Sequence, residues 1–240
     1  MKEVVITADK IKKRKKFYKR TKLIVFIILL ILIFSFIILS IVYNGGRFTV
    51  TLDNNFALKS GIILYEKEEF QNDQTRKLYA ENIDFLDNIS IDWLPKDIDN
   101  EKDGSHNGEN YIAYTFYIEN EGEEIINYWY SIIIDDVIKN VDEAVRVMIY
   151  LNGEKEIYAK VNSSTKEAEK DTKVFLDNKE KEIILEQRKD FKPSDKDKFT
   201  VVIWLEGDDP DCVDALIGGE IKMHMEIREE HKEQEGVKNE

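Results

Sequence analysis

The stretch from Leu23 to Tyr43 constrains the fold of this chain most. Its twenty-one residues, LIVFIILLILIFSFIILSIVY, include no charged side chain. As an α-helix the stretch would be about 31 Å long, which matches the hydrocarbon core of a bilayer. A helix also satisfies its own backbone hydrogen bonds in lipid. We therefore predict a transmembrane signal-anchor helix at 23–43. A buried core helix and a cleaved signal peptide are the alternatives.

The residues that precede this segment predict its orientation. Residues 1–22 carry ten Lys and Arg against Glu3 and Asp9, a net charge of +8. Positive residues next to a membrane span stay on the cytoplasmic side, and they also suit the anionic inner leaflet. We expect a single-pass protein of the cell membrane, with a cytoplasmic N-terminus and an extracellular C-terminal domain. The lipid bilayer is its first expected partner.

The rest of the chain is strongly acidic. The whole chain has a net charge of −13, so residues 23–240 carry −21. This charge argues against nucleic acid as a partner and favours solubility and cation binding. Cys212 is the one cysteine, so the outward-facing part has no internal disulfide. Together with the Ile- and Lys-rich composition, this favours a bacterial surface.

The sequence predicts one extracellular acidic domain at 44–227, an antiparallel β-sandwich that is jelly-roll-like, and an immunoglobulin-like topology fits the strand pattern as well. Short β-branched and aromatic runs alternate with turn residues, and helical patterns are few, apart from one turn at 141–144. The tail 228–240 is charged and expected to be disordered. Strands are expected at 47–52, 61–66, 78–80, 111–119, 125–136, 145–151, 155–160, 173–175, 182–187, 199–205 and 219–227. The run 83–93 fits strand alternation only in part, because Leu86 and Leu94 interrupt it.

Turn residues predict how some of these strands pair. The run 120–123 predicts a hairpin between 111–119 and 125–136. Asn152-Gly153, the strongest two-residue hairpin signal, predicts a second hairpin. Apolar side chains alternate with polar ones through 219–227, which places one face of that strand in the core. Trp204 belongs to an almost continuous apolar run, so we expect it to be buried.

Signals of catalysis are poor. The three histidines, His106, His224 and His231, lie outside any H-E-x-x-H pattern. The sequence contains neither G-x-S-x-G nor a phosphate-binding loop. Cys212 stands close to two aspartates, which raise a thiol pKa. We therefore expect a protein that is not an enzyme, with no catalytic residues.

A set of aromatic residues permits two interpretations. Such residues form carbohydrate-binding platforms, but they also fill cores and pair across strands. Strand spacing favours the core for this set. Its members are Tyr111, Tyr114, Phe116, Tyr117, Tyr128, Trp129 and Tyr130.

Two acidic loops, 97–108 and 206–214, cluster the oxygen ligands that calcium binds in groups of six to eight. Neither loop follows the EF-hand spacing, so solvated Asx turns are the alternative for both. Apart from calcium we expect no cofactor. The candidate calcium ligands are Asp208, Asp209, Asp211 and Asp214.

The end of the chain resembles a known family. The run Ile203-Trp204-Leu205-Glu206-Gly207-Asp208-Asp209-Pro210-Asp211-Cys212, then Gly218-Gly219 and the alternating strand, is similar to the C-terminal part of camelysin/TasA-like surface proteins of Gram-positive bacteria. Tyr111–Gly122 is similar to an early strand and turn of that family. The resemblance implies a jelly-roll protein of the cell surface or biofilm matrix, exported with a dedicated signal peptidase. Camelysin has been described as a peptidase, although no catalytic residue can be carried over to this chain.

These observations together favour a membrane-anchored bacterial surface protein with a structural, adhesive or matrix-associated role. Its expected partners beyond the bilayer are components of the cell envelope or other copies of itself. The alternatives are a camelysin-like surface metallopeptidase and a tethered subunit of an envelope complex. Zinc content and protease assays would test for the metallopeptidase. Co-purification from detergent would reveal the envelope complex.

We predict that the mature protein keeps Leu23–Tyr43. Signal peptidases need small residues at the first and third positions before the cut. Cleavage after Gly45 would put Tyr43 at the third position, and cleavage after Gly46 would put Asn44 there. Mass spectrometry of the native protein measures the mature N-terminus. An N-terminus between Asn44 and Thr49, with protein in the medium, would contradict retention and favour a released matrix subunit.

Overall fold

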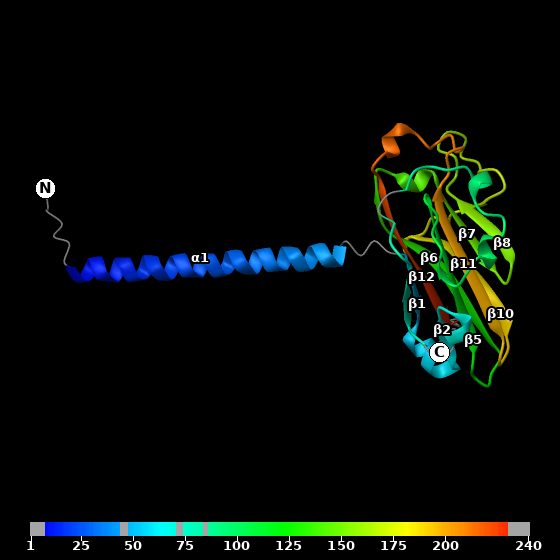
Figure 1. Cartoon of the computed structure of the whole chain (residues 1–240), viewed down its shortest axis with the longest axis horizontal. Helices are drawn as coiled ribbons and strands as arrows, with labels where there is room; N and C mark the ends of the chain where they lie inside the picture. The colour runs from blue at the N-terminus through cyan, green and yellow to red at the C-terminus, as the bar shows by residue number, and fades with distance from the viewer. Residues whose placement is uncertain (1–7, 44–47, 71–73, 84–85, 230–240) are drawn as a thin grey trace, which may run out of the picture. The chain divides into compact units, whose positions relative to one another are not determined.

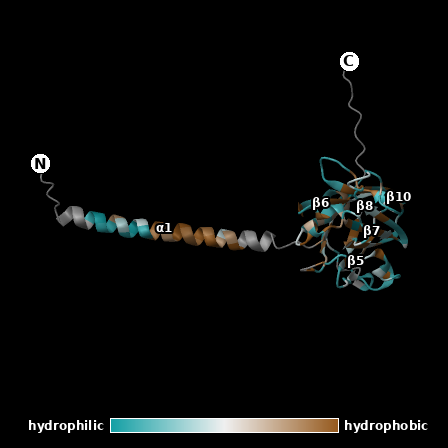
Figure 2. Cartoon of the chain, turned by 90° about the horizontal axis from the view of Figure 1, so that it is seen from above, coloured by the Kyte–Doolittle hydropathy of each residue, from teal (hydrophilic) through white to brown (hydrophobic). Residues whose placement is uncertain are grey.

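The computed structural model describes residues 8–43, 48–70, 74–83 and 86–229. The chain forms two compact units, Met1–Gly45 and Gly46–Glu240. The first holds α1 (Ala8–Tyr43), a single continuous helix whose basic part is followed by its apolar part (Figure 2). Lys13–Ile37 is long and apolar enough to cross a membrane, and none of its most apolar window is buried. A core helix would be mostly buried, so α1 contains a signal sequence or a membrane anchor.

The second unit is a β-sandwich, as predicted, built from a five-stranded and a seven-stranded sheet among the described residues (Figure 1). Sheet A runs β10 (Glu182–Phe191), β6 (Ile126–Ile138), β12 (Glu220–Glu229), β1 (Thr49–Leu52) and β3 (Lys77–Tyr79). Sheet B runs β2 (Ile62–Tyr65), β5 (Tyr111–Asn120), β11 (Lys196–Leu205), β7 (Val145–Leu151), β8 (Glu154–Ala159) and β9 (Lys173–Val174), with β4 (Gly104–Ser105) beside β5.

Most strand pairs are antiparallel, but both sheets are mixed. The first strand of the sandwich, β1, pairs in parallel with the last, β12, and in antiparallel with β3. The short β9 pairs in parallel with β8. A strictly antiparallel sandwich is therefore a simplification, because the two ends of the domain meet side by side in sheet A.

The expected hairpin between 111–119 and 125–136 is wrong. The two strands exist, but β5 pairs with β2, β4 and β11, whereas β6 pairs with β10 and β12. The chain crosses from sheet B to sheet A between them. Asn120 anchors this crossing, because its amide donates to the carbonyls of Glu124 and Phe191, both at 2.9 Å. Gly122 lies so close to Ser60 that a Cβ there would approach the Ser60 carbonyl oxygen to 2.2 Å.

The partial strand alternation at 83–93 does not correspond to a strand in the described part of that run. Residues 91–93 form the 3-10 helix η2 (Ile91–Trp93), capped by the Ser90 side chain. Ile89 makes a single bridge to Glu206, and residues 84–85 lie outside the described part. The apolar residues of this segment cover the outer face of sheet B, where Ile89 and Leu94 pack with Trp204. Apolar residues thus alternate in part of this segment although its described residues do not form a strand.

Other strand predictions are confirmed. Asn152 and Gly153 have φ angles of 54° and 86°, as a type I′ turn requires, and they join β7 to β8. In β12, Met223, Met225 and Ile227 are buried, so the alternation does mark a core face. The strand continues through Arg228 and Glu229, which the predicted disordered tail included; residues 230–240 lie outside the described part.

Aromatic residues fill the space between the sheets. Phe116 stacks on Phe199 with ring centroids 5.3 Å apart, and the Tyr130 ring meets Phe199 edge-on. The core interpretation of the aromatic set is confirmed for its five buried members, while Tyr111 and Trp129 are half-buried. The buried members are Tyr114, Phe116, Tyr117, Tyr128 and Tyr130.

One buried carboxylate links the two sheets. Asp197 of β11 accepts hydrogen bonds from the Tyr128 hydroxyl of β6 at 2.6 Å and from Arg188 Nε of β10 at 3.0 Å. It also accepts one from the Asn152 amide at 2.7 Å. Burial, followed by the charge of Asp197, raises the pKa of Tyr128 well above its ordinary value, so this hydroxyl stays a donor. The carboxylate therefore joins sheet A, sheet B and the β7–β8 turn.

Short helices complete the unit. In α2 (Asn54–Ser60) the Asp53 side chain caps the helix by accepting from the Phe56 backbone N–H at 2.8 Å. The helical turn expected at 141–144 is confirmed as η4. The remaining single turns are η1 (Glu68–Phe70), η3 (Ile98–Asn100), η4 (Val141–Glu143) and η5 (Asp214–Leu216).

We predict that Tyr128→Phe lowers the free energy of unfolding of the sandwich by about 2 kcal/mol, because it removes a hydrogen bond to a buried charge. Urea denaturation of residues 46–240 measures this loss. Tyr79→Phe is the matched control, since Tyr79 is 54% exposed and its change should stay within about 0.5 kcal/mol. A Tyr128→Phe effect as small as the control would show that Asp197 is held without this hydroxyl.

Candidate functional site

The loop after β11 is organised by Glu206. Its carboxylate accepts hydrogen bonds from Trp204 Nε1 at 3.0 Å, from the Ile91 backbone N–H at 3.1 Å and from the Asp208 backbone N–H at 3.2 Å. Trp204 is buried, as predicted. The backbone of Ile89 also pairs with Leu205 and Gly207 on either side of Glu206. The loop is therefore fixed against the segment that covers sheet B.

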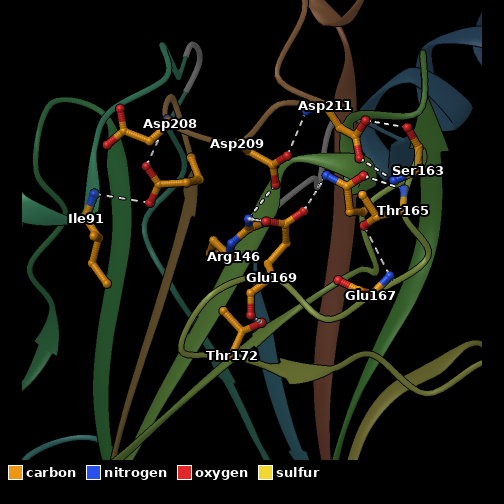
Figure 3. Close-up of polar contacts among 12 residues, drawn as sticks. Ile91, Arg146, Ser163, Thr165, Glu167, Glu169, Thr172, Asp208, Asp209 and Asp211 are labelled. Carbon is orange, nitrogen blue, oxygen red and sulfur yellow. Dashed lines mark hydrogen bonds and ion pairs between the residues drawn. The ribbon is translucent and has the colours of Figure 1, made fainter.

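The four predicted calcium ligands do not converge. Asp208 accepts a hydrogen bond from the Ser90 hydroxyl at 2.6 Å, and it lies on the other side of the loop from Asp209 (Figure 3). Asp214 begins η5 and is exposed. Only Asp209 and Asp211 lie together.

Asp209 is paired with a buried arginine. Its side chain is fully buried and forms an ion pair with Arg146 of β7, whose side chain is 5% exposed. Its other oxygen accepts from the Asp211 backbone N–H at 2.8 Å. A buried ion pair of this kind is costly to break from one side, because the remaining charge stays buried without its partner. Arg146 and Asp209 thus fasten the acidic loop to sheet B.

Asp211 reaches the loop 160–172 instead. Its carboxylate accepts hydrogen bonds from the hydroxyl and the backbone N–H of Ser163. These bonds, the hydroxyl bond first, hold the pKa of Asp211 below its ordinary value. The carboxylate is therefore charged at neutral pH.

Glu169, which the sequence interpretation missed, completes the group. It lies 3.9 Å from Arg146, and it accepts from the Asn162 amide at 3.1 Å. Oxygens of Glu169, Asp209 and Asp211 lie within 4.8 Å of one another. We call these three residues the carboxylate cluster. Glu169 is forty residues from the acidic loop in a charged connecting segment, so no local pattern marked it.

The cluster has the chemistry of a weak cation site. Three carboxylates and one guanidinium leave two net negative charges, and carboxylate oxygens are the donors that calcium prefers. However, Arg146 and Ser163 already bind Asp209 and Asp211. Each carboxylate oxygen of the cluster already has a hydrogen-bond or ion-pair partner. The residues therefore fit calcium only in part, and any calcium bound here competes with existing contacts.

Cys212 has the features of an inert thiol. It is half-buried, and its sulfur lies 3.5 Å from the Asn88 amide nitrogen, which donates to it. Burial first, and then the charges of Asp209 and Glu206, raise the thiol pKa. The predicted increase in the thiol pKa is confirmed, although its main cause is burial and not the neighbouring acids.

The other acidic loop, 97–108, is held by contacts within the loop and by contacts to β5 and η1. The buried His106 ring places its nitrogens 3.0 and 2.9 Å from the carbonyl oxygens of Gly104 and Ile98. Asp103 accepts from the Tyr117 hydroxyl at 2.7 Å and from the Glu68 backbone N–H at 2.9 Å. Both oxygens of the Asp103 carboxylate are therefore engaged by donors from other segments of the chain.

His224 lies on the outer face of sheet A and is half-buried. Its Nδ1 is 3.0 Å from Asp135 and its Nε2 is 3.4 Å from Glu226. The ring therefore lies between two carboxylates. His231 lies outside the described residues.

Comparisons with known proteins do not identify the chain. No family model and no curated protein matches it. A crystal structure of β-glucosidase from Kluyveromyces marxianus in complex with glucose has 12% identity and a TM-score of 0.28, over 78% of this chain and 18% of that chain. The selenomethionine-labelled enzyme has 11% identity and a TM-score of 0.26, over 71% and 16%. This chain spans less than a fifth of those chains, and such scores carry no argument about function.

The calcium prediction has a direct test. Calcium bound to the folded form alone would raise the melting temperature of residues 46–240 at millimolar concentrations. We expect Asp209→Asn and Glu169→Gln to reduce this calcium-dependent shift, and Asp214→Asn, the control outside the cluster, to preserve it. Differential scanning fluorimetry with calcium or chelator measures the shift. If calcium leaves the melting curve of the unsubstituted protein unchanged, the loop is a solvated turn and not a calcium site.

Proposed function

We propose that this chain is a membrane-anchored, non-enzymatic surface protein of a bacterial cell, with the β-sandwich outside. The observation that carries the proposal is α1, in which an unburied apolar segment directly follows a basic segment. An apolar helix exposed on every side needs an apolar environment, and a bilayer supplies it at the required thickness. The basic flank assigns the cytoplasmic side to the N-terminus.

The residues that could take part in catalysis are engaged in structural contacts, and this supports a non-enzymatic role. His106 is enclosed by backbone carbonyls, and Cys212 has a raised pKa. The metallopeptidase alternative draws on the carboxylate cluster, which contains no histidine among its three residues. Catalytic zinc sites use histidine, with carboxylate or cysteine as additional ligands. The described residues thus favour binding over catalysis.

A role at the cell surface or in the matrix is supported by the resemblance to camelysin/TasA-like proteins. The motif that carries it, Trp204 to Cys212, forms the loop that Glu206 and Asp209 fasten to sheet B. The motif residues therefore hold this loop in place in this chain. In this proposal the sandwich binds envelope components or other copies of the chain.

A second candidate function, a tethered subunit of an envelope complex, is favoured by large apolar side chains on the surface of the sandwich. Leu58, Trp93 and Ile217 are 78%, 73% and 67% exposed. An exposed tryptophan is a frequent anchor of protein interfaces. Co-purification of a stoichiometric partner in detergent, lost on Trp93→Ala, would favour this candidate over a self-associating surface protein.

The orientation can be tested on intact cells. We expect added protease to remove a C-terminal tag and to leave an N-terminal tag protected until the cells are lysed. Immunoblotting of both tags provides the measurement, and a cytoplasmic protein serves as the control for lysis. A C-terminal tag that resists protease in intact cells would refute the external position of the sandwich.

A further inference from the structure

The basic part of α1 carries more positive charge than the helix itself can balance. Between Lys13 and Lys22 the helix has seven cationic residues, and the sequence has no acidic residue from Lys10 to Lys22. Cations four residues apart on a helix repel one another, as Lys15 and Lys19 must do here. An external layer of anions close to the helix would therefore relieve this repulsion.

These cations surround the helix. Residues at spacings of three and four share a helix face, so Lys13, Lys16 and Arg20 line one face. Lys15, Lys19 and Lys22 line another. All the side chains from Lys13 to Lys22 are exposed. We call this segment the basic collar; its cations are Lys13, Arg14, Lys15, Lys16, Lys19, Arg20 and Lys22.

Two exposed aromatic residues lie inside the basic collar. Phe17 and Tyr18 are 68% and 66% exposed. Tyr18 precedes Leu23 by five residues, which is about 7.5 Å along the helix. The polar headgroup layer is roughly 5–8 Å thick on each side of the hydrocarbon core, so Tyr18 falls at its depth and Phe17, one residue further out, lies at its outer edge. Aromatic residues at this depth are typical of membrane interfaces.

The remaining cations lie within electrostatic reach of the headgroups. Lys13 precedes Leu23 by ten residues, or about 15 Å. It is therefore about one Debye length, near 8 Å at physiological salt, beyond the headgroup layer. Because α1 is continuous through Lys22 and Leu23, the helix holds the collar at a fixed position relative to the span.

From this arrangement we propose that the basic collar binds anionic phospholipid headgroups and gathers them around the span. This inference rests on the proposed membrane anchor and adds its lipid specificity. The ligand is the phosphate of an acidic lipid such as phosphatidylglycerol. The collar has positive charge on several faces, which suits a layer of anions around the helix better than a single ion. It also has aromatic rings near headgroup depth.

The test uses the full chain reconstituted in phosphatidylcholine vesicles with trace spin-labelled lipid. Electron paramagnetic resonance measures how strongly labelled phosphatidylglycerol and labelled phosphatidylcholine associate with the protein. We expect phosphatidylglycerol to associate about fivefold more strongly at low salt, which corresponds to about one effective cation. The preference should fall as salt rises to about 0.5 M, where the Debye length is shorter.

Matched variants separate the collar from general charge. Changing Lys13, Arg14, Lys15 and Lys16 to Gln should reduce the preference roughly threefold. The control removes four exposed lysines of the sandwich and should leave it unchanged. Those control changes are Lys96→Gln, Lys102→Gln, Lys155→Gln and Lys179→Gln.

Each failure has a different meaning. Equal association of the two lipids with a protein that floats with the vesicles overturns the collar and leaves the anchor intact. A preference that survives the collar changes, or that the control changes abolish equally, also overturns the collar. A full chain that does not float with phosphatidylcholine vesicles overturns the membrane anchor itself, and the collar with it.

Discussion

The sandwich depends on a charge buried between its sheets. Two sheets packed only through apolar faces can slide, since apolar contacts have little directional preference. Asp197 removes this freedom, because its carboxylate binds Tyr128 and Arg188 of sheet A and Asn152 at the β7–β8 turn. A buried carboxylate without these donors would cost several kcal/mol. The same interaction therefore sets the position of β11, and with it the position of the acidic loop that follows.

Sequence patterns predicted the fold where local chemistry decides it. The apolar N-terminal helix needed only length and apolarity, the Asn152-Gly153 hairpin needed only positive φ angles, and the face of β12 needed only alternation. The hairpin of β5 and β6 failed because a short turn between two apolar strands fits both a hairpin and a crossing between sheets. What separates them is the contact of Gly122 with Ser60 and of Asn120 with Phe191, which are distant in sequence.

The candidate site, too, was predictable only where local sequence decides the structure. The acidic loop was predicted as a place of clustered oxygens, yet its aspartates face three different neighbours. Asp208 binds Ser90, Asp209 binds Arg146 and Asp211 binds Ser163. Each of these partners comes from another segment of the chain, so spacing within the loop could not reveal which carboxylates converge. Arg146 also lies in an apolar strand, where a sequence pattern indicates core and not an ion pair.

The place of β1 has a mechanical consequence. The chain enters the sandwich at this four-residue strand, which lies between β12 and β3 inside sheet A. If the span is held in a membrane and the sandwich is bound elsewhere, tension reaches the domain through Thr49. A pull along the strand loads its hydrogen bonds to both neighbours together, in shear, and they cannot open one after another. Extraction of β1 would also remove the buried Val50 and Leu52 from the core. The resistance of the domain to a pull is thus set by its first strand and its last, which hold each other in place.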